Sequence, residues 1–174
     1  MNLSRFEGKL VQALNATTQV LGLNDLTIEI ILGVDFKAKL NKRDITGELS
    51  IIAEIKKASP SAGILRNNFN HIDIAKSYVE NGAPFLSVLT EEDFFLGNLI
   101  HVSKVKQKIN LPILCKDFFI DPFQVHLAKS YGADAILIIL AGVTEKMANQ
   151  LYEGALKLNM SVIVEVHTLS LIHI

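Results

Sequence analysis

The sequence has only one cysteine and no long apolar run, and both shortages narrow what the protein can be. The single cysteine, Cys115, excludes an internal disulfide framework and fits a reducing compartment. No apolar run approaches the ~20 residues that a membrane span needs, so a membrane partner is not expected. Residues 1–7 (MNLSRFE) lack the apolar core of a secretory signal. The cytoplasm is therefore the expected compartment. An organellar address stays open, although this segment is not rich in arginine.

An excess of charge of one sign is also missing. The chain has 17 basic and 18 acidic residues without a basic stripe, so nucleic acid is not expected as a partner.

No two histidines have ligand spacing on one helix face, so no metal site is expected. The histidines are His71, His101, His126, His167 and His173. Apolar residues are abundant instead. They make up 49% of the chain, and the mean hydropathy of +0.32 suits a sheet that is buried on both faces.

Short apolar runs recur from residue 51 onward and alternate with helical patterns. The runs cover residues 51–55, 85–89, 111–115, 135–140 and 162–166. This alternation predicts parallel βα units, arranged either as an open doubly wound sheet or as a closed (β/α)₈ barrel. No Gly-x-Gly-x-x-Gly follows the first run, which argues against a dinucleotide-binding sheet. A barrel needs eight units in about 250 residues, so as a barrel this 174-residue chain would be incomplete.

The helix boundaries between these runs also have local signals. Asn81-Gly82 and the similar Gly132 are good helix ends, and each comes just before an apolar run. Asp121-Pro122 and Thr144 are good helix starts. The first 49 residues are harder to interpret. Apolar residues at positions 6, 10, 11 and 14 favour a helix, β-branched residues within 26–34 favour a strand over a buried helix, and the lysines within 36–43 indicate a solvated helix or linker.

Charged residues lie where the apolar runs end, which is one rim if the strands are parallel. Glu54 and Lys56 alternate along the first run and therefore project to the same side. Lys116 directly follows an apolar run. Its stem would lie in the core and its ammonium at the rim, where it can act as a proton donor. The alternatives are structural ion pairs: Glu54 with Lys56, and Lys116 with Asp117. Glu165 at the fifth run could likewise polarise a substrate or only form an ion pair.

Aromatic residues flank the same rim, and they too have two interpretations. Phenylalanines 94, 95, 118 and 119 follow the second and third runs. Such side chains usually belong to the core, but one or two of them could hold a planar apolar substrate. Cys115 alternates with Lys116 and is expected to be a small core residue on the opposite face.

Five segments in this order resemble the indole-3-glycerol phosphate synthase family. They extend from about residue 51 to residue 167. The segments are 52–63 (IAEIKKASPSAG), 86–90 (LSVLT) with 94–97 (FFLG), 112–118 (PILCKDF), 132–137 (GADAIL) and 164–167 (VEVH). The resemblance implies an α/β fold, a (β/α)₈ TIM barrel with N-terminal helices, of which this chain would hold the first five strands.

The resemblance also implies a reaction, its substrate and its residues. The family converts 1-(2-carboxyphenylamino)-1-deoxyribulose 5-phosphate to indole-3-glycerol phosphate in tryptophan biosynthesis, with loss of carbon dioxide and water and without a cofactor. By this similarity Lys116 is the general acid for ring closure, Lys56 binds the substrate carboxylate and later transfers protons, Glu165 serves dehydration, and Glu54 stabilises charged intermediates. The substrate contacts would be Ser61, Phe95 and Phe118.

The two ends of the chain depart from the family pattern. We expect an N-terminal extension over residues 1–49, a partial barrel over 50–167 and an atypical tail over 168–174 (TLSLIHI), which fits no family helix and indicates a truncated chain. The polypeptide would then be a catalytically inactive fragment of a lyase. A different phosphosugar barrel, such as a phosphoribosyl isomerase, is the further alternative, against which Lys56, Lys116 and Glu165 together argue. Fusion to, or association with, other tryptophan-pathway enzymes stays open.

Overall fold

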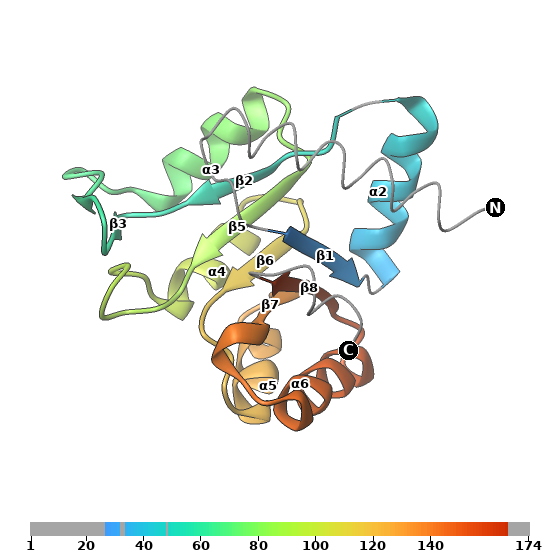
Figure 1. Cartoon of the computed structure of the whole chain (residues 1–174). Coiled ribbons are helices and arrows are strands. Elements are labelled where there is room, and N and C mark those ends of the chain that lie inside the picture. Colours follow the sequence, from blue (N-terminus) through green and yellow to red (C-terminus); the bar gives the residue numbers. More distant parts are fainter. Residues whose placement is uncertain (1–26, 32–33, 48, 167–174) are drawn as a thin grey trace.

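The computed structural model of the chain describes residues 27–31, 34–47 and 49–166. Within these residues six strands form one sheet in the order β1-β8-β7-β6-β5-β2 (Figure 1). The strands are β1 (Thr27–Ile31), β2 (Ile52–Ile55), β5 (Phe85–Leu89), β6 (Ile113–Lys116), β7 (Ala135–Ile139) and β8 (Ser161–Val166). The five strands from β2 to β8 are parallel and adjacent in chain order, as the apolar runs predict.

The strand β1 lies at one edge of this sheet, beside the last of the parallel strands. The β-branched segment does form a strand, as its composition favours, and it pairs antiparallel with β8 from Thr27↔Val166 to Ile31↔Val162. The fifth parallel strand is therefore covered, whereas five parallel strands alone would leave it as an open edge. The helix predicted from positions 6 to 14 and the tail 168–174 lie outside the described residues.

The helices of the described residues are α2 (Val34–Thr46), α3 (His71–Glu80), α4 (Leu99–Lys106), α5 (Pro122–Ser130) and α6 (Glu145–Lys157), with a short 3₁₀ turn, η1 (Leu140–Gly142), before α6. Helix α2 leads into β2, helices α3 to α6 connect the parallel strands, and polar side chains cap the starts of these four connecting helices. Asp121 forms a capping box with Gln124 at the start of α5, and Thr144 accepts from Met147 N–H at the start of α6. Both predicted helix starts are confirmed.

Two of these helices end in the same way. Gly82 and Gly132 follow α3 and α5 with φ of 81° and 92°, a backbone conformation that favours glycine. The next amide then donates back to the helix: Ala83 N–H to Tyr78 O at 2.9 Å, and Ala133 N–H to Ala128 O at 3.1 Å. This Schellman-type ending turns the chain directly into β5 and β7, which explains the repeated sequence pattern.

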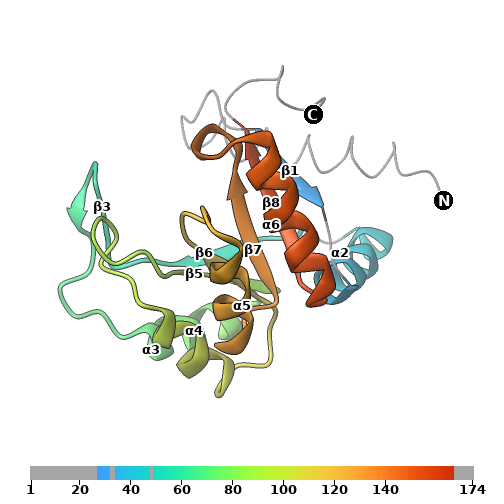
Figure 2. The same cartoon turned by 90° about the horizontal axis from the view of Figure 1, so that it is seen from below.

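The sheet has two apolar faces with different coverings. Helices α3 to α6 pack on one face and bury one core cluster, and Figure 2 shows α3, α4 and α5 gathered on one side of the strands, well away from α2. On the other face, here called the inner face, Phe36 of α2 stacks on Phe85 of β5 with ring centroids 4.4 Å apart. The segment 36–43 lies within α2, in line with the helical alternative, and Lys42 is exposed, but Phe36 is fully buried on the inner face, which its neighbouring lysines did not indicate.

Asp134 joins three strands at the N-terminal end of the sheet. Its carboxylate accepts from Lys106 Nζ at 2.5 Å and from Ile113 N–H at 2.8 Å, and its carbonyl accepts from Ser161 N–H at 2.8 Å. These contacts tie α4, β6, β7 and β8 together. In parallel βα folds this end serves stability, while chemistry is found at the opposite end.

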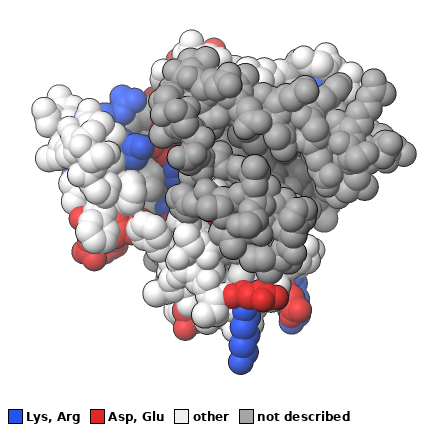
Figure 3. Space-filling view, in the orientation of Figure 1, with Lys and Arg blue, Asp and Glu red and all other residues white. Residues whose placement is uncertain are grey.

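Two surface features bear on possible partners. Among the described residues, no helix combines the length and the apolar character that crossing a bilayer requires. Figure 3 shows small separate groups of acidic and basic side chains among the described residues on the face in view.

Candidate active site

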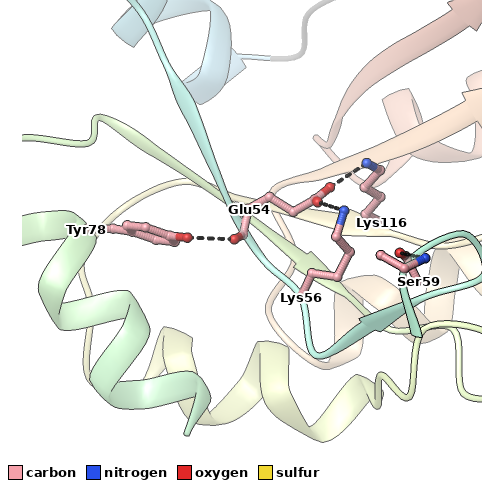
Figure 4. Close-up of polar contacts among 6 residues, drawn as sticks. Glu54, Lys56, Ser59, Tyr78 and Lys116 are labelled. Carbon is pink, nitrogen blue, oxygen red and sulfur yellow. Dashed lines mark hydrogen bonds and ion pairs between the residues drawn. The ribbon is translucent and has the colours of Figure 1, made fainter. Parts of the chain in front are cut away.

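Glu54 is the centre of an ion cluster at the C-terminal end of the parallel strands. Its two carboxylate oxygens each contact a different lysine, Lys56 Nζ at 2.5 Å and Lys116 Nζ at 2.5 Å (Figure 4). Glu54 and Lys56 come from the end of β2, and Lys116 is the last residue of β6. The structure therefore brings together three of the four charged residues that the sequence singles out.

The environment of Glu54 favours its charged form. Burial by itself raises the pKa of this carboxyl, but the charge and hydrogen bond of Lys116, followed by those of Lys56, outweigh it and hold the pKa below its ordinary value. All three side chains keep between 27% and 35% of their surface exposed, so the cluster remains accessible to a ligand. Two cations that share one anion form a site with a net positive charge, which suits an anionic substrate.

Lys116 pairs with Glu54 and not with Asp117, the alternative that the sequence left open. Thr90 Oγ1 donates to one Asp117 oxygen at 2.5 Å, and Phe118 N–H donates to the other at 2.8 Å. Burial raises the pKa of Asp117, and these two hydrogen bonds oppose that rise only in part. Thr90 N–H also donates to Lys116 O at 3.1 Å, which fixes the main chain from which the lysine extends.

Glu165 lies on the inner face of β8, two strands from Lys116. Its strand pairs with β7, where Glu165 is opposite Ile139, and with β1, where it is opposite Ile28. It is partly exposed and lies near the C-terminal end of its strand, as the sequence predicts. The structure thus places Glu165 on the same rim as Lys116, with β7 between their two strands.

Ser61 occupies the exposed turn of a small hairpin that follows Lys56. The hairpin consists of β3 (Ala58–Ser59) and β4 (Gly63–Ile64), and Figure 1 shows it extending beyond the ends of β2 and β5. Ala58 N–H donates to Phe95 O at 3.3 Å, which ties the hairpin to the loop after β5. The structure places Ser61 on a loop of the rim but does not bring it into the ion cluster.

The predicted aromatic contacts, Phe95 and Phe118, lie near each other at the rim. Their ring centroids are 6.3 Å apart and their planes meet at 52°. Phe118 is 46% exposed and Phe95 is partly exposed, so both have surface free for a ligand. The Glu91 carboxylate accepts from Phe95 N–H at 2.9 Å and thereby shapes this loop.

A close backbone contact explains why residue 97, in the same segment as Phe95, is a glycine. A Cβ at this position would lie 2.5 Å from Leu89 O, the carbonyl of the last residue of β5. Gly97 N–H donates to Glu91 O at 2.7 Å, which closes the turn. The loop can therefore return over the end of β5 only with glycine here.

Sequence reasoning overlooked two residues beside Glu54. The Tyr78 hydroxyl donates to Glu54 O at 2.9 Å and links α3 to β2 (Figure 4). The sequence identifies Tyr78 only as part of a helical face. Ser87, within the segment 86–90, is buried and faces Glu54 in register across β2 and β5. A serine inside an apolar run is a weak signal that could have drawn attention to it.

The described residues contain no group of three or more histidine, cysteine and carboxylate side chains that could hold a metal ion. Lysines and carboxylates of the kind gathered at this rim are side chains that can transfer protons. A curved parallel βα sheet with such groups at its C-terminal strand ends is typical of enzymes built on (β/α) barrels. The chain belongs to the indole-3-glycerol phosphate synthase family, whose sequence model matches residues 9–173.

Curated relatives agree with this assignment. The chain is 42% identical over 158 residues to the indole-3-glycerol phosphate synthase of Desulforamulus reducens, covering 91% of this chain and 58% of the relative. It is 45% identical over 133 residues to that of Zymomonas mobilis subsp. pomaceae, covering 76% and 50%. With the protein of the same name from Aliarcobacter butzleri, the identity is 48% over 119 residues, covering 68% and 45%. The chain spans about half the length of the curated relatives it matches.

Proposed function

We propose that this chain is the catalytic-rim portion of an indole-3-glycerol phosphate synthase. The whole protein would close the indole ring of 1-(2-carboxyphenylamino)-1-deoxyribulose 5-phosphate with loss of carbon dioxide and water, in the cytoplasm and without a cofactor. The observation that carries this proposal is the contact of Glu54 with both Lys56 and Lys116 at the strand ends, in a chain of this family.

Lys116 is the general acid of this proposal. As the aromatic ring carbon attacks the ketone carbon of the substrate, the ketone oxygen gains negative charge and must receive a proton. The ammonium of Lys116 lies at the end of β6, with 35% of its side chain exposed and its main chain fixed by Thr90, which suits delivery of that proton. A donor that is positioned before the reaction needs little reorganisation in the transition state.

The other residues bind the substrate and support the later steps. Lys56 binds the substrate carboxylate, which replaces Glu54 as its anionic partner and leaves as carbon dioxide once the ring has closed. Glu54 then stabilises the cationic intermediate, because a glutamate carboxylate is an anion at neutral pH. Glu165 takes part in the loss of water. Phe95 and Phe118 pack on the aromatic ring, and Ser61 contacts the substrate from its loop.

The test is Lys116→Ala in a version that has the full length of the relatives. We expect turnover to fall by about two orders of magnitude or more, the usual scale for the loss of a general acid, with a smaller effect on KM. Indole-3-glycerol phosphate formation is followed by its fluorescence. Lys157→Ala, which changes an exposed lysine of α6, is the matched control and should leave turnover unchanged. Near-normal turnover of Lys116→Ala would remove this residue from the acid role.

A second proposal concerns the 174-residue chain by itself, because it spans about half the length of its relatives. We propose that it is catalytically inactive unless a complementary segment completes the barrel. The substrate phosphate would be bound by strands beyond those seen here, and remote binding energy of this kind positions the reacting groups. Mixing the chain with the missing half of a relative, then assaying product, tests both parts of this statement.

A further inference from the structure

The inner face of the sheet holds a buried hydroxyl that forms no hydrogen bond within the described residues. Ser87 lies in the middle of β5 and is 4% exposed. Its Oγ is enclosed and has no hydrogen-bond partner among the described residues. Buried polar groups are normally hydrogen-bonded, and one that is not lowers the stability of the folded state. An alanine would avoid this cost, so the hydroxyl invites a functional explanation.

The position of Ser87 places it beside the ion cluster. Side chains alternate along β5, and Phe85 faces Phe36 on the inner face, so Ser87 lies on the inner face as well. Ser87 is in register with Glu54 of β2 on one side and with Leu114 of β6 on the other. The nearest polar side chain in that register is therefore the carboxylate of Glu54.

The ion pair between Glu54 and Lys116 extends across β5. In the sheet order β2-β5-β6, the strand that carries Ser87 lies between the strands that carry these two residues. Their side chains nevertheless meet at 2.5 Å, so the two side chains together span β5. A small side chain at position 87 permits this path. It also leaves a hydroxyl near the carboxylate.

Both Glu54 oxygens are occupied by lysines in the resting arrangement, and this changes when either lysine binds another anion. Under the proposed function, Lys56 turns to the substrate carboxylate and Lys116 to the substrate oxygen. Glu54 would then be a partly buried carboxylate that has lost its partners, which is unfavourable. We propose that Ser87 is a positioning residue whose hydroxyl donates to the Glu54 carboxylate when a lysine leaves it. The role given to Ser87 rests on the proposed function, but the experiment that tests it does not.

The test measures the titration of Glu54 and needs neither substrate nor turnover. The carboxyl carbon of Glu54 is followed by ¹³C NMR in the 174-residue chain and assigned by its loss in Glu54→Gln. With both lysines present, Ser87→Ala should shift the pKa of Glu54 by less than about 0.3 unit. With Lys116→Met, which frees one oxygen, Ser87→Ala should raise that pKa by about one unit, the scale of one hydrogen bond to a carboxylate.

Two further variants make the result decisive. Ser87→Thr keeps the hydroxyl and should keep the low pKa of Glu54 in the Lys116→Met background. Ser161→Ala removes another buried serine from the same sheet, 1% exposed and at its opposite end, and should leave that pKa unchanged in both backgrounds. If Lys116→Met does not fold, Lys56→Met frees the other Glu54 oxygen and serves the same purpose.

The same pKa of Glu54 with serine and with alanine in the lysine-deficient background would overturn this inference. So would an equal shift from Ser161→Ala. Either result would leave the proposed function standing, since that is judged by the turnover of Lys116→Ala. Conversely, normal turnover of Lys116→Ala together with the expected Ser87 effect would overturn the acid role of Lys116 and leave this inference standing.

Discussion

Acid should destabilise this chain through His101, whose ring is partly buried between α3 and α4. His101, near the start of α4, stacks on His71, the first residue of α3, with ring centroids 4.4 Å apart. Phe69 contacts the same ring at 5.5 Å between centroids. Nδ1 of His101 and Nε2 of His71 are buried without hydrogen-bond partners among the described residues. A proton added to His101 would therefore place a charge beside apolar rings, with no acceptor at Nδ1.

The charges that face His101 all act in the same direction. Burial, followed by the positive charge of His71, Lys104 and Lys57, lowers the pKa of His101 from 6.5 to about 4. These groups come from α3, from α4 itself and from the loop after β2. Between pH 6.5 and about 4 the unfolded chain binds a proton that the folded chain does not. Stability therefore rises with pH across this window, and the contribution is fully present above it.

The size of the effect follows from the shift. A change of this extent corresponds to ~3 kcal/mol at most, at about 1.4 kcal/mol per pKa unit. The ring is only partly buried, and solvent screens part of the unfavourable interaction. We expect about 1 to 2 kcal/mol of unfolding free energy to be lost between about pH 7.5 and pH 4 because of His101.

The assay is urea unfolding of wild type and His101→Phe across this pH range. Phenylalanine keeps a ring for stacking but cannot bind a proton, so the variant should lose about 1 to 2 kcal/mol less on acidification. Comparing the two proteins removes the contributions of carboxyl groups that titrate in both. His126→Phe, which changes an exposed histidine of α5, is the control. Identical pH dependence of wild type and His101→Phe would refute the reasoning.

Three other expectations follow from the fold. Gly97→Ala should lower the free energy of unfolding in urea by about 1–3 kcal/mol, because its Cβ would overlap Leu89 O. An unchanged urea midpoint would show that this close contact is absent. Asp134→Ala should cost about 2–4 kcal/mol by the same measurement, since it leaves Lys106 and Ile113 N–H without their acceptor. Glu153→Ala, which breaks an exposed pair with Lys157, is the control and should cost less than ~0.5 kcal/mol. The 174-residue chain alone should form no product and should associate through β2, an edge strand of the described sheet; a monomer in sedimentation with measurable turnover would show that both expectations are wrong.

Local patterns were enough to predict most elements of this fold. The apolar runs became the five parallel strands because a strand buried on both faces needs apolar side chains at consecutive positions. Asp121, Thr144 and the two glycine helix ends were identified correctly, since caps and left-handed turns depend on a few neighbouring residues. The placement of Glu54 and Lys56 on one side also follows from alternation along a single strand.

Contacts between distant segments were beyond local reasoning. The strand β1 covers β8, a partner that lies more than 130 residues further along the chain and that no local pattern specifies. Lys116 meets Glu54 across β5, although Asp117 is its neighbour in the chain, because the Asp117 carboxylate is held by Thr90 and by Phe118 N–H. Burial of Phe36 against Phe85 likewise depends on where α2 packs.

The sequence by itself therefore determined the family, the order of strands and helices, and which residue types stand at the strand ends. These properties depend on short-range periodicity and on residues within a few positions of each other. The tertiary structure alone decided which charges meet, that Ser87 lies enclosed beside Glu54, and that His71 and His101 stack 4.4 Å apart. The physical reason is that strand register and helix packing set distances between residues far apart in the chain, and those distances govern both pairing and pKa.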